Sequence, residues 1–566
     1  MTMEIFTSRE MGHEMRNQIS SIDRDVLQYQ LVGVANEMSE ALRRTSYSSI
    51  IWDVYDYACA LFSPNAEMLA QADTIPAQLG TMSTALRAML KKHPLSKWRP
   101  GDVFICNDPY KGCTHTPDIT VFSPVFNGGE IIAITSSIAH HVDIGGRVPQ
   151  TTHIENTEVF GEGLIFPQMR IVKEGEYNED VLDFISSNVR NPHACIGDLR
   201  AQIASCRTGE KRLEELAKRL GNGVFKELVS GILDYGEHYI RQVLSEIPGG
   251  VYEAEILNED GVTSAELIKI KVKIEIKDRE ISLDFDGTSE QRPCALNCPW
   301  SSTVSMATYA LKCLFAPSMP SNEGFNRPIK ISAPLGSIVN PRRPAAVGGR
   351  HSLQQAVADV VIKALSPVAA ERGAASAQIS FPVFRATGID TRNSLPGEDE
   401  KRFMIMCIMG GGMGGSVKAD GLDAVDTHGG NCALLSAEVM ETLSPIRVLQ
   451  SRLVPGSGGE GKHRGGLAIE RDFEVLSHEA LVASSLQQGS DETAPWGILG
   501  GKSGKPAGML LNPETPVEKK LPSRFRHTLL KKGDVVRVRS AGGGGFGDPA
   551  ERSAEDIARD QAQGYI

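Results

Sequence analysis

The sequence predicts an α+β protein of several domains, with extensive antiparallel sheet and a β-rich C-terminal lobe. The chain has 566 residues, more than one hydrophobic core usually organises. After Pro248-Gly249-Gly250 the apolar residues change from helical spacing to strict alternation, as in ELIKIKVKIEIK. Helix and strand patterns do not alternate regularly, which argues against a Rossmann or TIM architecture. We expect an N-terminal domain over 1–247, a mixed α/β domain over 248–435 and a β-rich lobe over 436–566.

Composition excludes several classes of protein. The net charge of −11 argues against nucleic acid as a partner, because phosphate binding requires clustered Lys and Arg. No run of about 18 apolar residues is present, so no membrane span is expected. The start of the sequence lacks the apolar core of a signal peptide. The ten cysteines are dispersed, which fits a reducing compartment, and we expect a cytoplasmic protein.

The first elements are two helices on either side of an apolar run. Residues 23–45 place Leu27, Leu31, Val34, Met38 and Leu42 on one stripe, with Asp23 or Asp25 as the N-cap. Residues 76–92 predict the second helix, beginning at a proline.

Two carboxylates lie in the apolar run between these helices. Asp53 and Asp56 are three residues apart in SSIIWDVYDYACALFSP. Carboxylates in such surroundings are unfavourable unless they are paired, cap a helix or bind a cation. A turn or capping role and a site role therefore both stay open for each.

A predicted β-hairpin follows the second helix. Residues 119–126 and 130–139 are rich in β-branched and aromatic residues, and Asn127-Gly128-Gly129 separates them. We expect Phe126 to pair with Glu130. That register places Asp118 opposite Ile138, Thr116 opposite His140 and His115 opposite His141.

The open end of the hairpin gathers two histidines and an aspartate. Asp118 and His140 share one face, whereas His141 takes the other. Pro117 predicts a bend that lets His115 join them. Two imidazoles and a carboxylate with open positions suit Zn, Mn or Fe(II). Two alternatives are a one-residue slip, which exchanges His141 for His140, and three solvated polar residues without a metal.

Other segments supply candidates for substrate binding. Asn107 and Asp108 precede the hairpin and either reach the metal region or form an Asx-turn. In MGGGMGGSV, Gly411 and Gly412 allow close backbone approach and either bind an anion, line the substrate cavity or make a tight turn. The chain contains no Walker A motif, so nucleotide binding is not expected on it.

Several motifs carry a family resemblance that covers almost the whole chain. NDPY-x-G-x-THTPDIT, AHH-x-DIGG, DF-x-GTS-x-Q and GGGGFGDP resemble the hydantoinase B/oxoprolinase family. That family includes the β-type subunits of ATP-dependent hydantoinases and lactamases and the metal-bearing subunits of acetone-type carboxylases. The resemblance implies a divalent metal at His115, Asp118 and His140. It also places Asp53 at the metal, with Asp where Glu is usual.

The resemblance implies an activity and a partner. A separate hydantoinase A-type ATPase subunit, in a hetero-oligomer of two copies of each (α2β2) or larger, would bind ATP and phosphorylate a small cyclic amide. This chain would then hydrolyse the activated hydantoin, oxoproline or lactam ring, with His141 or Asp56 as the base. Alternatives are the metal-bearing subunit of a ketone carboxylase and a non-catalytic scaffold for the ATPase subunit.

Overall fold

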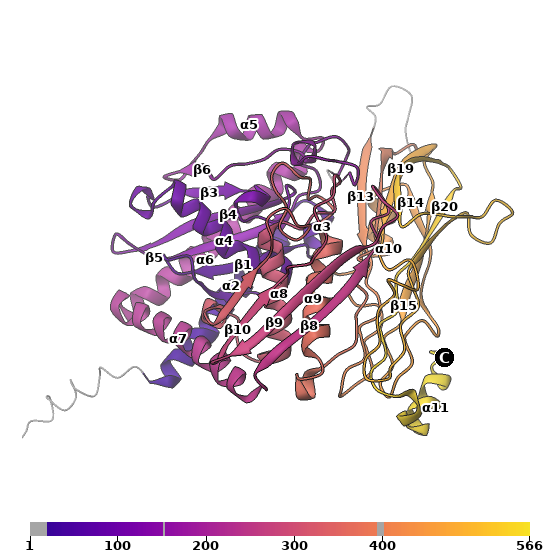
Figure 1. The fold of residues 1–566 in the computed structure, drawn as a ribbon. Helices are drawn as coiled ribbons and strands as arrows, with labels where there is room; N and C mark the ends of the chain where they lie inside the picture. Colours follow the sequence, from indigo (N-terminus) through magenta and orange to yellow (C-terminus); the bar gives the residue numbers. More distant parts are fainter. Residues whose placement is uncertain (1–19, 151–152, 393–400) are drawn as a thin grey trace, which may run out of the picture.

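The computed structural model describes residues 20–150, 153–392 and 401–566. Within these residues the chain forms four β-sheets, of seven, four, four and five strands, and the helices pack mainly against the first two of them (Figure 1). The predicted α+β class with extensive antiparallel sheet is confirmed. No helix in the described ranges is long and apolar enough to span a membrane.

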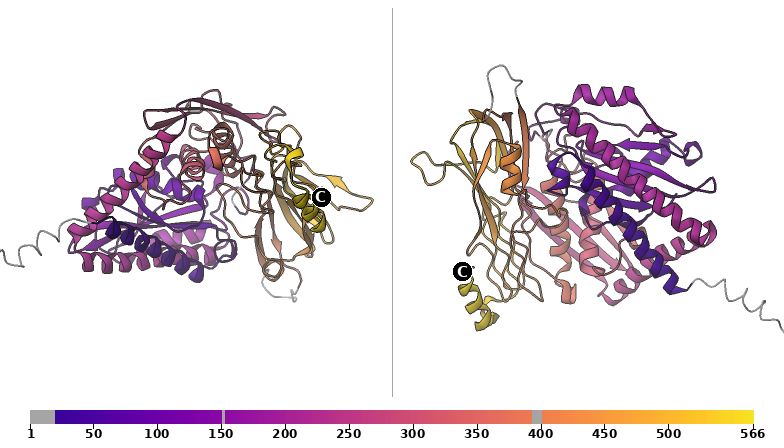
Figure 2. Two further views of the ribbon diagram at one scale, coloured as in Figure 1. Left: turned by 90° about the horizontal axis from the view of Figure 1, so that it is seen from below. Right: turned by 180° about the vertical axis from the view of Figure 1, so that it is seen from behind.

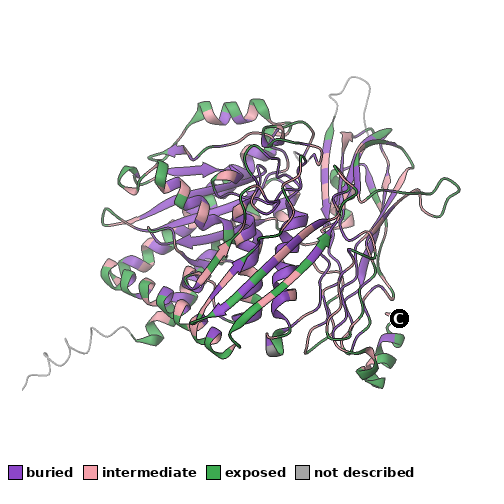
Figure 3. Ribbon diagram, in the orientation of Figure 1, coloured by how far each residue is buried: buried purple, intermediate pink, exposed green. Residues whose placement is uncertain are grey.

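The first sheet has the strand order β2-β1-β5-β4-β3-β6-β7. Its strands are β1 (Tyr57–Phe62), β2 (Met68–Gln71), β3 (Val103–Cys106), β4 (Asp118–Asn127), β5 (Glu130–His140), β6 (Met169–Lys173) and β7 (Glu176–Tyr177). Most of these strands are buried along their length (Figure 3), because helices cover both faces.

Helices α2 (Ser21–Thr45) and α6 (Pro192–Leu220) cover one face of this sheet (Figure 2, right). The predicted apolar stripe of α2 is buried throughout. Its N-cap is Ser20, not Asp23 or Asp25; Asp23 instead completes a capping box by accepting the Ser20 N–H. Helix α4 (Pro76–Lys92) packs on the opposite face.

The hairpin of β4 and β5 differs from its predicted register at the turn. Asn127 pairs with Glu130 across Gly128 and Gly129, both of which have positive φ. A two-residue turn of this kind requires left-handed backbone, which glycine adopts without strain. Phe126 consequently pairs with Ile131 rather than Glu130.

A β-bulge between Val125 and Phe126 shifts the register once more. Asp118 therefore lies directly opposite His140 instead of Ile138. The two shifts together amount to two residues, so each side chain keeps its predicted face. The predicted pairs of Thr116 and His115 with the end of β5 do not form, and the His141 N–H donates to the Pro117 carbonyl.

The second sheet follows α7 (Asn222–Glu246) and is crossed by helices α8 (Trp300–Phe315) and α9 (His351–Leu365). Its order is β11-β10-β9-β8, formed by β8 (Gly250–Asn258), β9 (Ile268–Lys277), β10 (Glu280–Asp284) and β11 (Ile329–Ser332). The predicted alternation holds in β9, where the isoleucines and Val272 are buried and the charged residues face outward.

Two antiparallel sheets form the C-terminal third. One is β13-β12-β16-β19, made of β12 (Val383–Ile389), β13 (Arg402–Ile408), β16 (Glu479–Ser485) and β19 (Arg524–Lys531). The other is β14-β15-β20-β17-β18, made of β14 (Ile446–Val454), β15 (Ala468–Val475), β17 (Gly508–Leu511), β18 (Lys519–Lys520) and β20 (Val535–Arg539). The sheet β13-β12-β16-β19 contains two strands from before residue 435, where we expected a domain boundary, and two from after it.

Glycine-rich segments at 410–415, 457–466, 496–504 and 541–547 lie against one another beside these sheets; we call them the glycine bundle. Gly543 is central, since its N–H donates to the Gly466 carbonyl and its own carbonyl accepts the Gly459 N–H. A Cβ on Gly543 would collide with the carbonyl oxygen of Met413. Backbones approach too closely here for side chains, which explains the abundance of glycine.

Candidate metal centre

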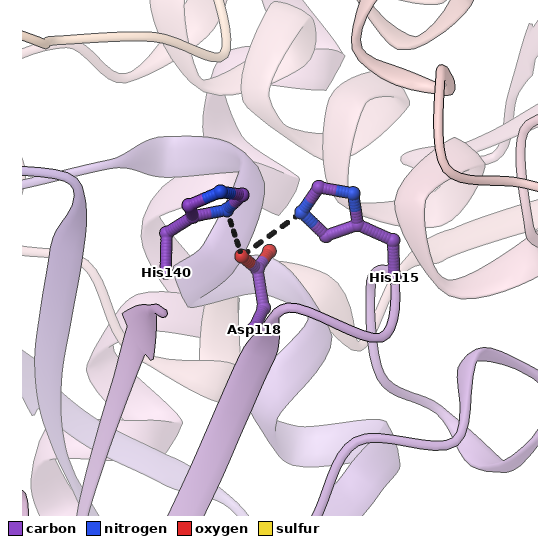
Figure 4. Close-up of side chains that lie close together, drawn as sticks. All are labelled: His115, Asp118 and His140. Carbon is purple, nitrogen blue, oxygen red and sulfur yellow. Dashed lines mark hydrogen bonds and ion pairs between the residues drawn. The ribbon is translucent and has the colours of Figure 1, made fainter. Parts of the chain in front are cut away.

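His115, Asp118 and His140 converge at the open end of the β4–β5 hairpin (Figure 4). His115 Nε2 lies 3.0 Å and His140 Nδ1 2.9 Å from Asp118 Oδ1. One ligand atom from each residue lies within 4.8 Å of the others, and all three residues are buried. The structure therefore brings together the three side chains that the sequence pattern selected.

Local backbone geometry places these side chains. Asp118 begins β4 and His140 ends β5, directly across the hairpin. The loop before β4 bends so that the Asp118 N–H donates to the His115 carbonyl, 3.2 Å away. The His140 N–H donates to the carbonyl of Asp56 at 3.0 Å, which brings the start of β1 to the same end of the sheet.

Neighbouring groups orient two of the three side chains. His115 Nδ1 lies 3.2 Å from the Gly348 carbonyl, so it carries the proton and leaves the Nε2 lone pair free. The second oxygen of Asp118 accepts hydrogen bonds from Thr114 Oγ1 at 2.5 Å and Arg350 Nη2 at 2.8 Å. The first oxygen faces the histidines.

The protonation states suit a cation. Burial lowers the pKa of His115 to about 4, so its imidazole is neutral at pH 7. Burial raises the pKa of Asp118, but the adjacent His115, His140 and Arg350 outweigh it and hold that pKa well below its usual range. Neutral imidazole and ionised carboxylate are the forms that bind metals.

The spacing also fits a divalent metal ion. Metal–ligand bonds of about 2.1 Å place adjacent ligand atoms about 3.0 Å apart in octahedral geometry. The two N–O separations at Asp118 match that value. Two imidazoles and one carboxylate are the donor set of Zn, Mn and Fe(II) sites.

The structure separates the two carboxylates of the apolar run. Asp56 Oδ2 lies 4.0 Å from His140 Nδ1, and its Oδ1 accepts a hydrogen bond from Gln78 Nε2 at 2.8 Å. Burial raises the pKa of Asp56 to about 6. Asp53 is not brought to the cluster, because its Oδ2 accepts the N–H of Ser436 at the start of α10 (Ala437–Leu443).

His141 lies on the opposite face of the strand from His140, as strand alternation predicts. Its Nε2 is 3.0 Å from Gln202 Oε1 and its Nδ1 is 3.5 Å from Cys195 Sγ, both on α6. The structure therefore does not bring His141 to the three-residue cluster.

The remaining sequence candidates hold loops. Asn107 donates to the carbonyls of Thr116 and Leu164, and so fixes the loop that carries His115. Asp108 accepts the Tyr110 N–H at 3.0 Å. Of the two alternatives for this residue, the structure therefore shows the Asx-turn. Gly411 and Gly412 lie in the glycine bundle, and neither lines the cavity of the cluster.

A cavity of about 50 Å³ opens onto the cluster. Its walls include residues that sequence reasoning missed: Arg350, which precedes α9, His351 and Gln354 of α9, and Phe381, Arg385 and Met406 from the C-terminal third. One sequence signal could have marked Arg385 as a candidate site residue: it is the single charged residue in the strand Val383–Ile389. Nothing in the local pattern pairs it with a hairpin more than two hundred residues earlier.

Comparison with known proteins identifies relatives of the whole chain. Residues 20–549 match the hydantoinase B/oxoprolinase family. An uncharacterised protein of Methanocaldococcus jannaschii is 36% identical over 93% of this chain and 90% of its own length. A candidate D-/L-hydantoinase B-type subunit of Pseudomonas sp. (strain NS671) is 31% identical over 98% of this chain and 94% of its own length. The 5-oxoprolinase 1 of Arabidopsis thaliana is 29% identical over 93% of this chain but only 42% of its own length.

Two solved structures share the fold. An ATP-dependent caprolactamase from Pseudomonas jessenii has a TM-score of 0.87 and 27% identity, covering 97% of this chain and 95% of that one. Acetone carboxylase has a TM-score of 0.88 at 19% identity, and the match covers 98% of this chain and 79% of the acetone carboxylase chain. On the family match across its length, this chain belongs to the hydantoinase B/oxoprolinase family.

Proposed function

We propose that this chain is the metal-dependent subunit of an ATP-dependent cyclic amidase, which hydrolyses a phosphate-activated hydantoin, oxoproline or lactam ring. The observation that carries the proposal is the buried group of two imidazoles and one carboxylate at a cavity. The hydantoinase, 5-oxoprolinase and caprolactamase relatives support the choice of cyclic amides.

His115, Asp118 and His140 would hold one divalent ion, Zn, Mn or Fe. Such an ion would lower the pKa of bound water and polarise a carbonyl oxygen, both of which favour amide hydrolysis. Arg350 and Thr114 keep the carboxylate of Asp118 in place through its second oxygen. Asp53 could join the site only after breaking its hydrogen bond to Ser436.

Asp56 is the stronger of the two proposed bases. Its Oδ2 lies 4.0 Å from His140 Nδ1 and lines the same cavity, so it can receive a proton from water there. The hydrogen bond from Gln78 fixes the carboxylate. His141 would need a different side-chain position, since Gln202 and Cys195 hold it on the other face.

ATP is expected on a separate hydantoinase A-type subunit, in an assembly of two copies of each or larger. More than half of the Arabidopsis 5-oxoprolinase lies outside the match to this chain. An activating ATPase would occupy that remainder in such fused proteins and a separate chain here. Purification with the co-expressed partner tests this arrangement.

Metal analysis tests the proposed site. We expect about one divalent ion per chain in the wild type, and a loss of at least tenfold in affinity in each of His115→Ala, Asp118→Ala and His140→Ala. His141→Ala is the matched control, because the imidazole of His141 is adjacent in sequence to His140 but faces away from the cluster. Stoichiometric metal in all three variants would contradict the site, as would a wild type that binds none.

Ring opening is the activity to assay, with ATP and the partner present. Labelled bicarbonate distinguishes the alternative ketone carboxylase, whose product would retain the label. The scaffold alternative predicts that the alanine variants assemble and support full activity.

A further inference from the structure

Arg385 carries a buried positive charge that no acidic side chain among the described residues balances. It is 8% exposed, and its Nε has no hydrogen-bond partner in the ranges that the structure describes. Within the described part of the chain, no ion pair or side-chain hydrogen bond involves it. Burial alone shifts its pKa, to about 10, so the guanidinium stays charged at neutral pH. An isolated buried charge is unfavourable unless a counter-charge binds beside it.

Arg524 of β19 is a second buried arginine with free donors. It is 2% exposed, and its Nε and Nη2 lack partners among the described residues, while Nη1 donates to the Leu486 carbonyl at 2.6 Å. Burial lowers its pKa to about 10 even though Glu259 and Asp260 oppose the shift from a distance. Neither acid approaches closely enough to form an ion pair.

The strand register places both arginines on one face of the sheet. Val383 of β12 pairs with Ser485 of β16, and Ser485 pairs with Arg524. Directly paired residues share a face, and Arg385 shares the face of Val383 because they are two residues apart. Val383 and Arg385 both line the cavity of the metal centre, so this face of the sheet lies toward His115, Asp118 and His140.

A second cavity of about 30 Å³ adjoins the first. Arg385 and His351 line both cavities, and Arg524 and His527 line only the second. Burial, followed by the charges of Arg385, Arg350 and Arg524, holds the pKa of His351 well below its usual range. Arg350 is already paired with Asp118, which leaves Arg385 and Arg524 as the unbalanced cations of this region.

We propose that Arg385, with Arg524 behind it, binds the phosphate group of the activated substrate beside the metal centre. Arginine presents planar donors that match phosphate oxygens, and two guanidinium groups balance the two charges of a phosphate better than the single charge of a carboxylate. The identity of the phosphate bearer rests on the proposed function, whereas the oxyanion pocket rests on the two arginines.

Phosphate binding by the full chain tests the pocket without any turnover. Calorimetric titration of inorganic phosphate into chelator-treated protein excludes a contribution from the metal. We expect Arg385→Met to weaken binding at least tenfold and Arg524→Met to weaken it less. Arg447→Met is the control, because Arg447 is exposed and paired with Glu474. Equal affinity in Arg385→Met and the wild type would overturn the proposal.

Thermal unfolding separates a binding role from a structural one. Removing an unbalanced buried charge should raise the melting temperature of the ligand-free chain, so Arg385→Met is expected to be more stable than the wild type while no longer responding to phosphate. A lower melting temperature or a failure to fold would show that Arg385 supports the fold, and would overturn the proposal. Arg385→Lys should recover part of the phosphate affinity. Acetate binding as tightly as phosphate would overturn the choice of phosphate.

The two proposals fail in different ways. Arg385-dependent phosphate binding by a chain that opens no cyclic amide with its partner leaves the pocket standing and removes the proposed function. Normal ring opening by Arg385→Met, at an unchanged KM for the activated ring, removes the pocket and leaves the function standing.

Discussion

At the scale of single residues, the metal centre depends on groups far apart in the chain. Asp118 is held by Thr114, four residues away, and by Arg350, 232 residues away. Sequence reasoning predicted the three cluster residues because two lie at the open end of one hairpin and His115 lies three residues before it. It missed Arg350 and Arg385 because the packing of distant elements, and no local pattern, brings them to the cavity.

The proposed base gives a prediction at this scale. Asp56→Asn keeps the shape of the side chain and removes the proton acceptor, so kcat should fall by about 10²–10⁴-fold while metal content is unchanged. Steady-state kinetics and metal analysis on the same preparations check both parts. Asp53→Asn, whose side chain accepts the Ser436 N–H instead of lining the cavity, should retain near-normal kcat; an equal loss in the two variants would argue against Asp56 as the base.

Asp426 gives a second prediction, for stability against pH. Burial raises its pKa from 3.8 to about 7, and its Oδ2 accepts the Cys432 N–H. The folded chain holds this proton more tightly than the unfolded chain. Its contribution is therefore complete below about pH 4 and is lost as the pH rises through about 7.

Asp426→Asn should remove that loss. Between pH 5 and pH 8 we expect the variant to gain about 2–3 kcal/mol in free energy of unfolding relative to the wild type. Urea denaturation at the two pH values measures the difference. Parallel stability profiles for variant and wild type would contradict the assignment.

At the scale of elements, helices and strand faces were the predictable features and registers were not. The apolar stripe of α2 and the alternation of β9 follow directly from side-chain spacing. The hairpin register required knowledge of a bulge between Val125 and Phe126, which arises from the pairing of two strands. The face of the sheet on which each side chain lies was still predicted correctly, because the two one-residue shifts preserve the alternation.

Two helical glycines allow a matched test of packing. A Cβ added to Gly33 of α2 would meet nothing within 4 Å, whereas a Cβ on Gly80 of α4 would collide with Ser305 of α8. Gly33→Ala should stabilise the chain by about 1 kcal/mol through helix propensity. Gly80→Ala should destabilise it by about 1–3 kcal/mol through overpacking. Denaturant midpoints compare them, and stabilisation by both would refute the contact between α4 and α8.

At the scale of the whole molecule, the cavity exists only where several parts of the chain meet. The hairpin of the first sheet supplies the cluster, α9 supplies His351 and Gln354, and β12 supplies Arg385. The hydrophobic core that includes α2 also includes residues of β15 and β20. Sequence reasoning predicted an α+β chain and its family, both confirmed; it could not predict this closure, since sheet faces meet through tertiary packing.

Metal binding should therefore stabilise the entire chain. When the free cation is at about 1,000 times its Kd, its binding to the folded chain adds about 4 kcal/mol to the free energy of unfolding. Chelation should lower the melting temperature of the wild type and leave that of His140→Ala unchanged, which differential scanning calorimetry can measure. An equal response in both would place the stabilising cation elsewhere.

The glycine bundle has a consequence for the order of synthesis and folding. Residues 541–547 hydrogen-bond with backbone near 376, 412, 459 and 502, so the bundle acquires its central segment only when that segment leaves the ribosome. Contacts between partners so distant in sequence form slowly. Until then a nascent chain exposes unpaired backbone in its C-terminal third, the condition in which chaperones bind and aggregation competes.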